Sequence, residues 1–118
     1  MQQLSATQLA EWLTAANPSP PDGDDGKSQR RPLLLDVREP WEYELCHLRA
    51  SLLVPMQTVP ARIKELSPDA DIVVICHHGV RSRQVGSFLE SKGFSSVFNL
   101  AGGVDAWADD VDPTMRKY

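Results

Sequence analysis

The stretch DIVVICHHGVRSRQVGS, residues Asp71–Ser87, decides the fold of this chain. Ile72–Ile75 is a continuous run of β-branched residues, which is typical of a strand buried on both faces of a parallel sheet. Ser82–Lys92 then has the pattern of a helix. Cys76 therefore leaves the carboxyl end of a strand and enters a tight loop before a helix. Open α/β sheets place their ligands at such positions.

The loop that follows Cys76 is suited to a reactive thiolate. Loop amides and the amino-terminal end of the next helix direct hydrogen-bond donors and partial positive charge at the loop centre. Arg81 and Arg83 add full positive charges nearby. Cysteines in such surroundings can have pKa values lowered to between about 3.5 and 7.5. We therefore predict that Cys76 is a nucleophile, with an inert core cysteine as the alternative.

Two further segments give the loop a recognisable context. Asp36–Glu39, DVRE, precedes the loop and Gly102–Trp107, GGVDAW, follows it. Together with Cys76–Ser82, CHHGVRS, these segments resemble three marks of rhodanese-type sulfurtransferases, in the order found in that family. The resemblance covers about Leu33–Trp107 and, more loosely, the amino-terminal helix. It implies a rhodanese-like fold of three layers and a cysteine that carries a persulfide.

The rest of the chain alternates between strand and helix patterns. Four strand patterns begin at Leu33, Leu52, Ile72 and Val97. Helical segments separate them, which predicts an α/β fold with a central, mainly parallel sheet flanked by helices. Ser5 and Gln8 form a capping-box pattern before a helix from about Ala6 to Ala16. The order of the strands in the sheet cannot be deduced from one sequence.

Length and composition predict a single domain over residues 1–118. A chain of 118 residues with 42% hydrophobic content and a net charge of −4 can bury one core. Basic residues are dense only at Arg30-Arg31 and in the loop, so nucleic-acid binding has little support. The longest apolar run, Ile72–Cys76, is too short to span a membrane. With two cysteines and no signal-peptide pattern, we expect a cytoplasmic location.

Two regions depart from the rhodanese pattern. Residues 17–31, NPSPPDGDDGKSQRR, predict a flexible loop that is either a solvated linker or a partner-docking segment. Cys46 and Ala50 stand where the family usually has glycines, beside His47, for which we expect a structural hydrogen bond. A zinc site that joins Cys46 to Cys76 and their neighbouring histidines is disfavoured by the ligand spacing. A resolving role for Cys46 stays open.

The resemblance implies a sulfurtransferase that uses no metal and no organic cofactor. Cys76 would take sulfur from a small anionic donor such as thiosulfate, hold it as a persulfide, and pass it to a thiol or cyanide acceptor, or to a sulfur-carrier protein. The residues expected to bind the substrate are His77, His78, Gly79, Val80, Arg81 and Ser82. For the two histidines, a solvated loop position without a role in binding is the alternative. Asp36 and Arg38 are expected to support the loop through polar contacts, with a weak surface ion pair as the alternative for Arg38.

Two other classes of function stay open. Phosphatases and arsenate reductases of the related cysteine-loop type use a Cys-x5-Arg loop, whereas Cys76 to Arg81 is one residue shorter. A non-catalytic binding module is the second class, and such modules commonly lack the cysteine. The sequence does not identify the physiological donor or acceptor, nor the oligomeric state.

Overall fold

The structure, a computed structural model, describes residues 1–16 and 31–118. Five parallel strands form one sheet in the order β1-β5-β4-β2-β3. They are β1 (Gln2–Leu4), β2 (Leu33–Asp36), β3 (Leu52–Leu53), β4 (Ile72–Ile75) and β5 (Val97–Leu100). The central strand β4 is buried over its whole length, as its β-branched run predicts.

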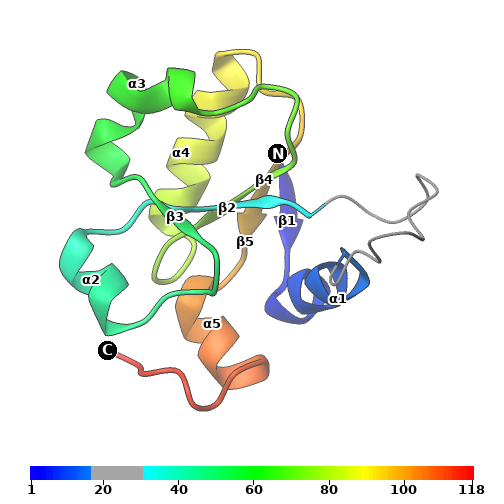
Figure 1. The fold of residues 1–118 in the computed structure, drawn as a ribbon, viewed down its shortest axis with the longest axis vertical. Helices are drawn as coiled ribbons and strands as arrows, with labels where there is room; N and C mark the ends of the chain where they lie inside the picture. The colour runs from blue at the N-terminus through cyan, green and yellow to red at the C-terminus, as the bar shows by residue number, and fades with distance from the viewer. Residues whose placement is uncertain (17–30) are drawn as a thin grey trace.

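Helices cover both faces of the sheet, which completes the predicted three layers (Figure 1). The α-helices are α1 (Ala6–Ala16), α2 (Pro40–Leu45), α3 (Val59–Arg62), α4 (Val80–Ser91) and α5 (Gly103–Asp110). Two short 3-10 helices, η1 (Met56–Thr58) and η2 (Ile63–Glu65), flank α3. One apolar cluster joins the sheet to α3 and α4, and a second joins it to α1 and α5.

Strand β4 supplies both clusters because successive side chains of a strand point to opposite faces. Ile72 and Val74 belong to the cluster under α4, whereas Val73 and Ile75 belong to the cluster under α5. Cys76 continues the first set and is 1% exposed. The strand therefore directs the Cys76 side chain toward the layer that contains α4.

Local sequence signals located most elements well. Helix α1 has the predicted bounds, and its capping box is formed: Ser5 N–H donates to Gln8 Oε1 at 2.8 Å, and Gln8 N–H donates to Ser5 Oγ at 3.1 Å. Helix α4 begins at Val80, two residues before the predicted start. Strand β1 was not predicted, because three residues with two exposed glutamines give no strand pattern.

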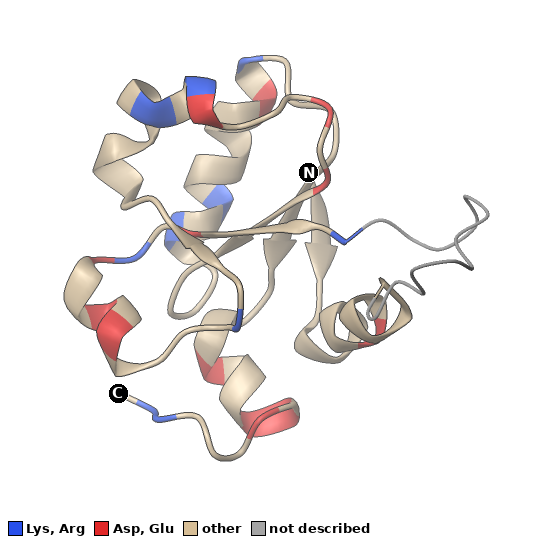
Figure 2. Cartoon of the chain, in the orientation of Figure 1, with Lys and Arg blue, Asp and Glu red and all other residues tan. Residues whose placement is uncertain are grey.

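Several sequence-based expectations concern the surface of the molecule. The predicted flexible loop at 17–31 lies outside the described residues, apart from Arg31. In the part of the chain that the structure describes, no helix has the length and apolar character needed to cross a membrane. Residues of both charges lie close together at the end of α3 and in η2 (Figure 2), whereas α4 has Arg81 and Arg83 at its start and Glu90 near its end. The two arginines therefore lie together next to the loop.

Candidate active site

The thiol of Cys76 receives two polar contacts from its own loop. Gly79 N–H donates to Cys76 Sγ at 3.0 Å, and Ser82 Oγ lies 3.3 Å from the same sulfur atom. Gly79 has φ of +102°, in the left-handed region that glycine adopts without strain. This turn brings the backbone amide onto the sulfur at the point where α4 begins. A thiolate or a sulfur anion at this position is stabilised by such a donor.

The loop rests on the amino-terminal end of α5. Val104 N–H donates to the Cys76 carbonyl at 2.9 Å, and Asp105 N–H donates to the His77 carbonyl at 3.1 Å. A Cβ atom on Gly103 would lie 2.3 Å from the Cys76 carbonyl oxygen, so no other residue fits there without displacing the loop. In this structure the Gly102-Gly103 turn thus supports the nucleophile's backbone.

Arg81 contacts a carboxylate of α2. Its guanidinium makes two hydrogen bonds with Glu42, each 2.8 Å long. These bonds, aided by the charges of Glu42 and Cys76, raise the pKa of Arg81 despite its partial burial. In turn, the hydrogen bonds from Arg81 lower the pKa of Glu42 to about 2. The pair ties the start of α4 to α2 beside Cys76.

Asp36 and Arg38 form a second ion pair, which is fully buried. Arg38 Nη2 donates to Asp36 Oδ2 at 2.7 Å and to the Cys46 carbonyl at 2.6 Å. Burial by itself lowers the pKa of Arg38, but hydrogen bonds with Asp36 and its charge outweigh burial and raise it. Both side chains are 0% exposed, so the surface-pair alternative is wrong for Arg38. Both side chains are held in polar contacts, but these go to each other, to α2 and to Tyr118, so their support of the loop stays a prediction.

Tyr118 joins the two ion pairs, although nothing in the sequence pointed to it. Its hydroxyl accepts from Arg38 Nη1 at 2.9 Å and donates to Glu42 Oε2 at 2.8 Å. Burial raises the pKa of Tyr118 to about 12, so the phenol keeps its proton at neutral pH. These bonds span 80 and 76 residues of sequence. Local patterns carry no signal over that separation.

The two loop histidines are stacked beside Tyr118. The His77 ring lies 3.9 Å from the His78 ring and 3.9 Å from the Tyr118 ring. Burial, together with the charge of His78, lowers the pKa of His77 and so favours its neutral ring. Its Nε2 atom is buried and has no hydrogen-bond partner among the described residues. His78 is exposed.

These histidines also form part of a group of potential metal ligands. Donor atoms of His77, His78 and Asp105 lie within 4.8 Å of one another. Asp105 is already engaged, because Lys117 Nζ lies 3.4 Å from its carboxylate. A cation would therefore have to compete with the Lys117 ammonium group. This group of residues differs from the cysteine–histidine set considered from the sequence.

Ser82 continues a line of polar contacts into the sheet. It is fully buried and its hydroxyl donates to Asn99 Oδ1. Asn99 Nδ2 donates in turn to Gln3 Oε1 at 2.8 Å. Asn99 was not singled out from the sequence, although a polar residue inside the apolar strand Val97–Leu100 is an available signal. The buried amide is therefore part of the environment of Cys76.

Cys46 lies on the other side of the sheet from Cys76. The two residues belong to separate apolar clusters, and both are free thiols. Cys46 Sγ is 3.8 Å from Arg38 Nη1. This arrangement gives no support to a resolving role for Cys46. His47 Nδ1 hydrogen-bonds the Tyr43 carbonyl at 2.8 Å, as expected for a structural residue.

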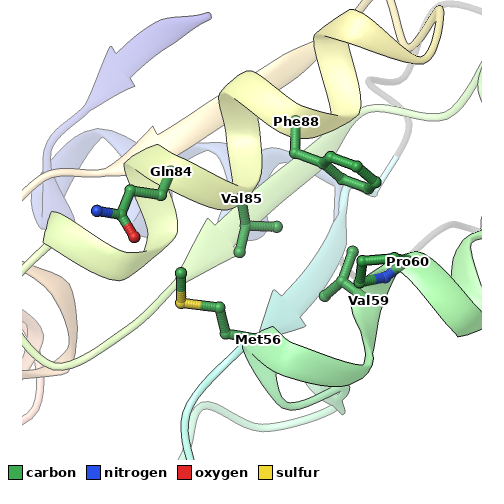
Figure 3. A pocket seen from close by; sticks show the side chains of 6 residues that line it. All are labelled: Met56, Val59, Pro60, Gln84, Val85 and Phe88. Atoms are coloured by element: carbon green, nitrogen blue, oxygen red, sulfur yellow. The ribbon is translucent and has the colours of Figure 1, made fainter.

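A shallow apolar pocket of about 200 Å³ lies between η1, α3 and α4 (Figure 3). Its lining residues are Met56, Val59, Pro60, Gln84, Val85 and Phe88. Val85 is three residues beyond Ser82 on α4, so the pocket lies one helical turn along from the loop. Val80, at the start of the same helix, is 56% exposed.

Comparison with known proteins identifies related chains of similar size. A family model described as Rhodanese-like domain matches residues 19–110. A sulfurtransferase from Allochromatium vinosum is 40% identical over 76 residues, which cover 64% of this chain and 71% of that protein. Thiosulfate sulfurtransferase GlpE from Pseudomonas fluorescens is 32% identical over 88 residues, which cover 75% of this chain and 81% of that protein.

Larger proteins contain a matching segment. Probable adenylyltransferase/sulfurtransferase MoeZ from Mycobacterium tuberculosis is 33% identical over 98% of this chain, but the match covers 26% of that protein. The chain spans 30% or less of the length of such larger relatives.

Among solved structures, a rhodanese-related protein from Thermoplasma volcanium superposes with a TM-score of 0.75 at 27% identity, over 94% of each chain. Because the superposition covers nearly the whole of both chains, the two proteins share the complete fold. Together with the family model and the sulfurtransferase relatives, it shows that this chain belongs to the rhodanese-like domain family.

Proposed function

We propose that this protein is a sulfurtransferase that carries sulfane sulfur as a persulfide on Cys76. The observation that supports this most directly is the Gly79 amide, which points at Cys76 Sγ from 3.0 Å at the start of α4. A donor in this position stabilises both an attacking thiolate and the anionic terminal sulfur of a persulfide. The similarity to proteins named as sulfurtransferases agrees with this chemistry.

The reaction proceeds through two substitutions at sulfur. The Cys76 thiolate attacks the outer sulfur of thiosulfate, forms a new S–S bond, and releases sulfite with the electron pair of the broken S–S bond. An acceptor thiolate or cyanide then attacks the terminal sulfur of the persulfide. That step breaks its bond to Cys76 Sγ and restores the Cys76 thiolate. No net oxidation or reduction by an outside reagent is needed.

The loop residues bind the anionic groups in this scheme. In this scheme the backbone amides from His77 to Ser82 bind the terminal sulfur, and the Gly79 amide already lies 3.0 Å from Cys76 Sγ. Arg81 acts through its charge and by holding the loop against Glu42, while the buried Asp36–Arg38 pair supports α2 and the turn after it. His78 and Arg83 are exposed, and the Arg83 guanidinium adds positive charge that attracts an anionic donor.

The donor, the acceptor and the location are proposed from the similar proteins and from the chemistry of a free thiol. Thiosulfate is the proposed donor because a thiosulfate sulfurtransferase is among the similar proteins. A small thiol or cyanide is the proposed acceptor. A sulfur-carrier protein is a second candidate acceptor, since the chain is also similar to an adenylyltransferase/sulfurtransferase. A reducing cytoplasm would keep Cys76 free for each cycle.

Intact mass spectrometry tests the proposal. After incubation with thiosulfate, we expect the protein to gain the mass of one sulfur atom, and dithiothreitol or cyanide to remove it. Cys76→Ser should abolish this gain, whereas Cys46→Ser should keep most of it because Cys46 lies on the other side of the sheet. Equal losses in the two variants would contradict a single nucleophile, and no gain in the wild-type protein would contradict sulfur transfer from thiosulfate.

A further inference from the structure

A line of hydrogen bonds leads from the nucleophile to the edge of the sheet. Cys76 Sγ lies 3.3 Å from Ser82 Oγ, the Ser82 hydroxyl donates to Asn99 Oδ1, and Asn99 Nδ2 donates to Gln3 Oε1 at 2.8 Å. Ser82 is 0% and Asn99 3% exposed, so neither has water as a substitute partner. Gln3 is exposed. The Ser82 end of the line is therefore buried, whereas the Gln3 end is exposed to solvent.

The register of the sheet brings the two amides together. Strand β1 pairs with β5 in parallel, with Gln3 directly beside Asn99 and Gln2 beside Phe98. Because side chains alternate along a strand, Gln2 and Gln3 point to opposite faces. Gln3 therefore shares with Asn99 the face of the sheet that α4 covers, and Gln2 does not.

In this line each group donates its proton to the next one, from Cys76 through Ser82 and Asn99 to Gln3. Asn99 Oδ1 carries no hydrogen, so the single Ser82 hydroxyl proton lies in the bond to Asn99. Ser82 then offers only a lone pair to Cys76 and accepts the S–H proton. This arrangement satisfies a Cys76 thiol. A thiolate has no proton to donate and would meet the Ser82 lone pair.

If the side-chain amides of Asn99 and Gln3 both turn over, donor and acceptor are exchanged in each hydrogen bond of the line and no bond is lost. If the Asn99 side chain turns over, its Nδ2 donates to Ser82 Oγ, and the Ser82 proton becomes free to bond the Cys76 thiolate. Asn99 Oδ1 then needs a donor, which Gln3 supplies through its own NH2 group when it turns over as well. Gln3 can do so at little cost because its side chain is exposed.

We propose that Asn99 and Gln3 are positioning residues that let Ser82 hydrogen-bond Cys76 in both of its protonation states, by reversing the direction of this line. This deepens the proposed function, on which it rests in treating Cys76 as a working thiolate. Its test requires no sulfur donor, so it can fail while sulfur transfer is confirmed, and the reverse.

The other charged and titratable groups around the loop do not belong to this line. They are Arg81 and Arg83 on α4, Glu42 on α2, the Asp36–Arg38 pair after β2, His77 and His78 in the loop, Asp105 of α5 with Lys117, and the Met1 amino group with Glu90. Arg81 interacts electrostatically with Cys76. Substitutions at Gln3 leave all these contacts in place, since Gln3 bonds none of these groups.

The test replaces Gln3 by residues that can only accept or only donate. In Gln3→Glu, the carboxylate accepts from Asn99 Nδ2 and holds the line in the direction that suits a thiol. In Gln3→Lys, the ammonium donates to Asn99 Oδ1 and holds the opposite direction. Gln2→Glu and Gln2→Lys are matched controls, with the same charges one residue away on the other face. About 1 M salt reduces the Debye length to about 3 Å and suppresses long-range effects of charge.

The measurement is the rate at which iodoacetamide alkylates Cys76 as a function of pH, followed by mass spectrometry of the peptide that contains Cys76. We expect the midpoint of the profile to rise by about one pH unit in Gln3→Glu and to fall in Gln3→Lys, as for the loss or gain of one hydrogen bond to a charged group. The Gln2 variants should move it much less. Equal shifts in the Gln2 and Gln3 variants, or none at Gln3, would overturn the proposal.

A buried variant gives a second, independent readout. Asn99→Asp keeps the shape of the side chain but supplies only acceptors when ionised, so it should move the midpoint to higher pH and slow alkylation at neutral pH by about tenfold. Circular dichroism and thermal melting check that this variant folds. A folded Asn99→Asp protein with an unchanged profile would contradict the role of Asn99 even if the Gln3 variants behaved as expected.

Discussion

Because Gly79 and Gly103 have no side chain, the loop backbone adopts a position that a residue with a Cβ atom would strain or block. The positive φ of Gly79 turns its amide toward Cys76 Sγ, and the missing Cβ of Gly103 leaves room for the Cys76 carbonyl oxygen. A contrasting case is Ala50, which has φ of +64° where the family usually has glycine. Ala50 carries some backbone strain in the turn after α2, at a distance from the loop in sequence.

Arg81 provides a prediction at the residue scale. Arg81→Lys keeps the charge but loses one of the two hydrogen bonds to Glu42, so thiosulfate:cyanide activity should fall only in part. Arg81→Ala removes the charge and the tie to α2, and kcat/KM should fall by about 100-fold, as for displaced catalytic groups. Steady-state kinetics with varied thiosulfate measure both effects.

The matched control for Arg81 is Arg83→Ala. Arg83 is exposed on the same helix and carries the same charge, but no hydrogen bond holds it to α2. This variant should change the KM for thiosulfate modestly and leave kcat nearly unchanged. Unaltered kinetics in Arg81→Ala would show that the loop amides are sufficient without the guanidinium.

At the scale of elements, the loop between β4 and α4 is held from three sides. Helix α5 supports the carbonyl groups of Cys76 and His77, α2 holds Arg81 through Glu42, and β5 holds Ser82 through Asn99. Each contact comes from a different element, so the loop geometry depends on the packing of the whole sheet and its helices. The length of the loop sets the size of the group that it can surround.

Loop length predicts sulfur transfer rather than phosphate ester hydrolysis. From Cys76 to Arg81 the loop is Cys-x4-Arg, one residue shorter than the loop of the related phosphatases. Its amides can surround one additional sulfur atom, whereas a phosphoryl group needs a wider ring of donors. Insertion of a glycine after Gly79 should therefore reduce thiosulfate:cyanide activity by about 100-fold, since displacing donors by about 1 Å has an effect of that size.

The companion assay uses an aryl phosphate such as 3-O-methylfluorescein phosphate with the wild-type protein. We expect no hydrolysis that depends on Cys76. If the wild-type protein cleaved this ester at a rate rivalling its sulfur transfer, and Cys76→Ser abolished the cleavage, the argument from loop length would be wrong. The phosphatase alternative would then replace the sulfurtransferase.

For the whole molecule, a connected set of polar side chains joins parts of the chain that are distant in sequence. Arg38, Glu42, Arg81 and Tyr118 are linked by hydrogen bonds from β2's end to the last residue of the sequence. Glu42 is at the centre of this set and is 4% exposed. Its loss would leave Arg81 and Tyr118 without their acceptor.

This arrangement predicts how stability depends on pH. The pKa of Glu42 is lowered from 4.5 to about 2 by Arg81, so the folded protein binds the Glu42 proton less tightly than the unfolded chain does. The stabilisation is fully present above about pH 5 and is lost as pH falls from 4.5 toward 2. Urea titrations between pH 7 and about pH 2 should show a smaller decrease in unfolding free energy for Glu42→Gln than for the wild-type protein.

The control for this prediction is Glu65→Gln. Glu65 pairs with Arg62 at the surface, where an ion pair contributes little to stability. Its pH dependence should stay close to that of the wild-type protein. If Glu42→Gln lost stability in acid as steeply as the wild-type protein, Glu42 would not be the group that links protonation to unfolding.

The sequence by itself determined the strand–loop–helix unit around Cys76, the bounds of α1 and the parallel α/β class. β-branched runs, helical periodicity and capping boxes act over a few residues, so they can be recognised locally. The same reasoning could not find β1, because Gln2–Leu4 becomes a strand only when β5 offers its edge. A three-residue segment has too few local interactions to specify its own conformation.

Only the tertiary structure decided which side chains surround the nucleophile. Glu42 reaches Arg81 across 39 residues of sequence, and Asn99 reaches Ser82 across 17. Tyr118 arrives from the end of the sequence to join both ion pairs. Hydrogen bonds and ion pairs select partners by distance and angle in the folded chain, and sequence spacing carries no information about these quantities beyond a few turns of helix or a hairpin.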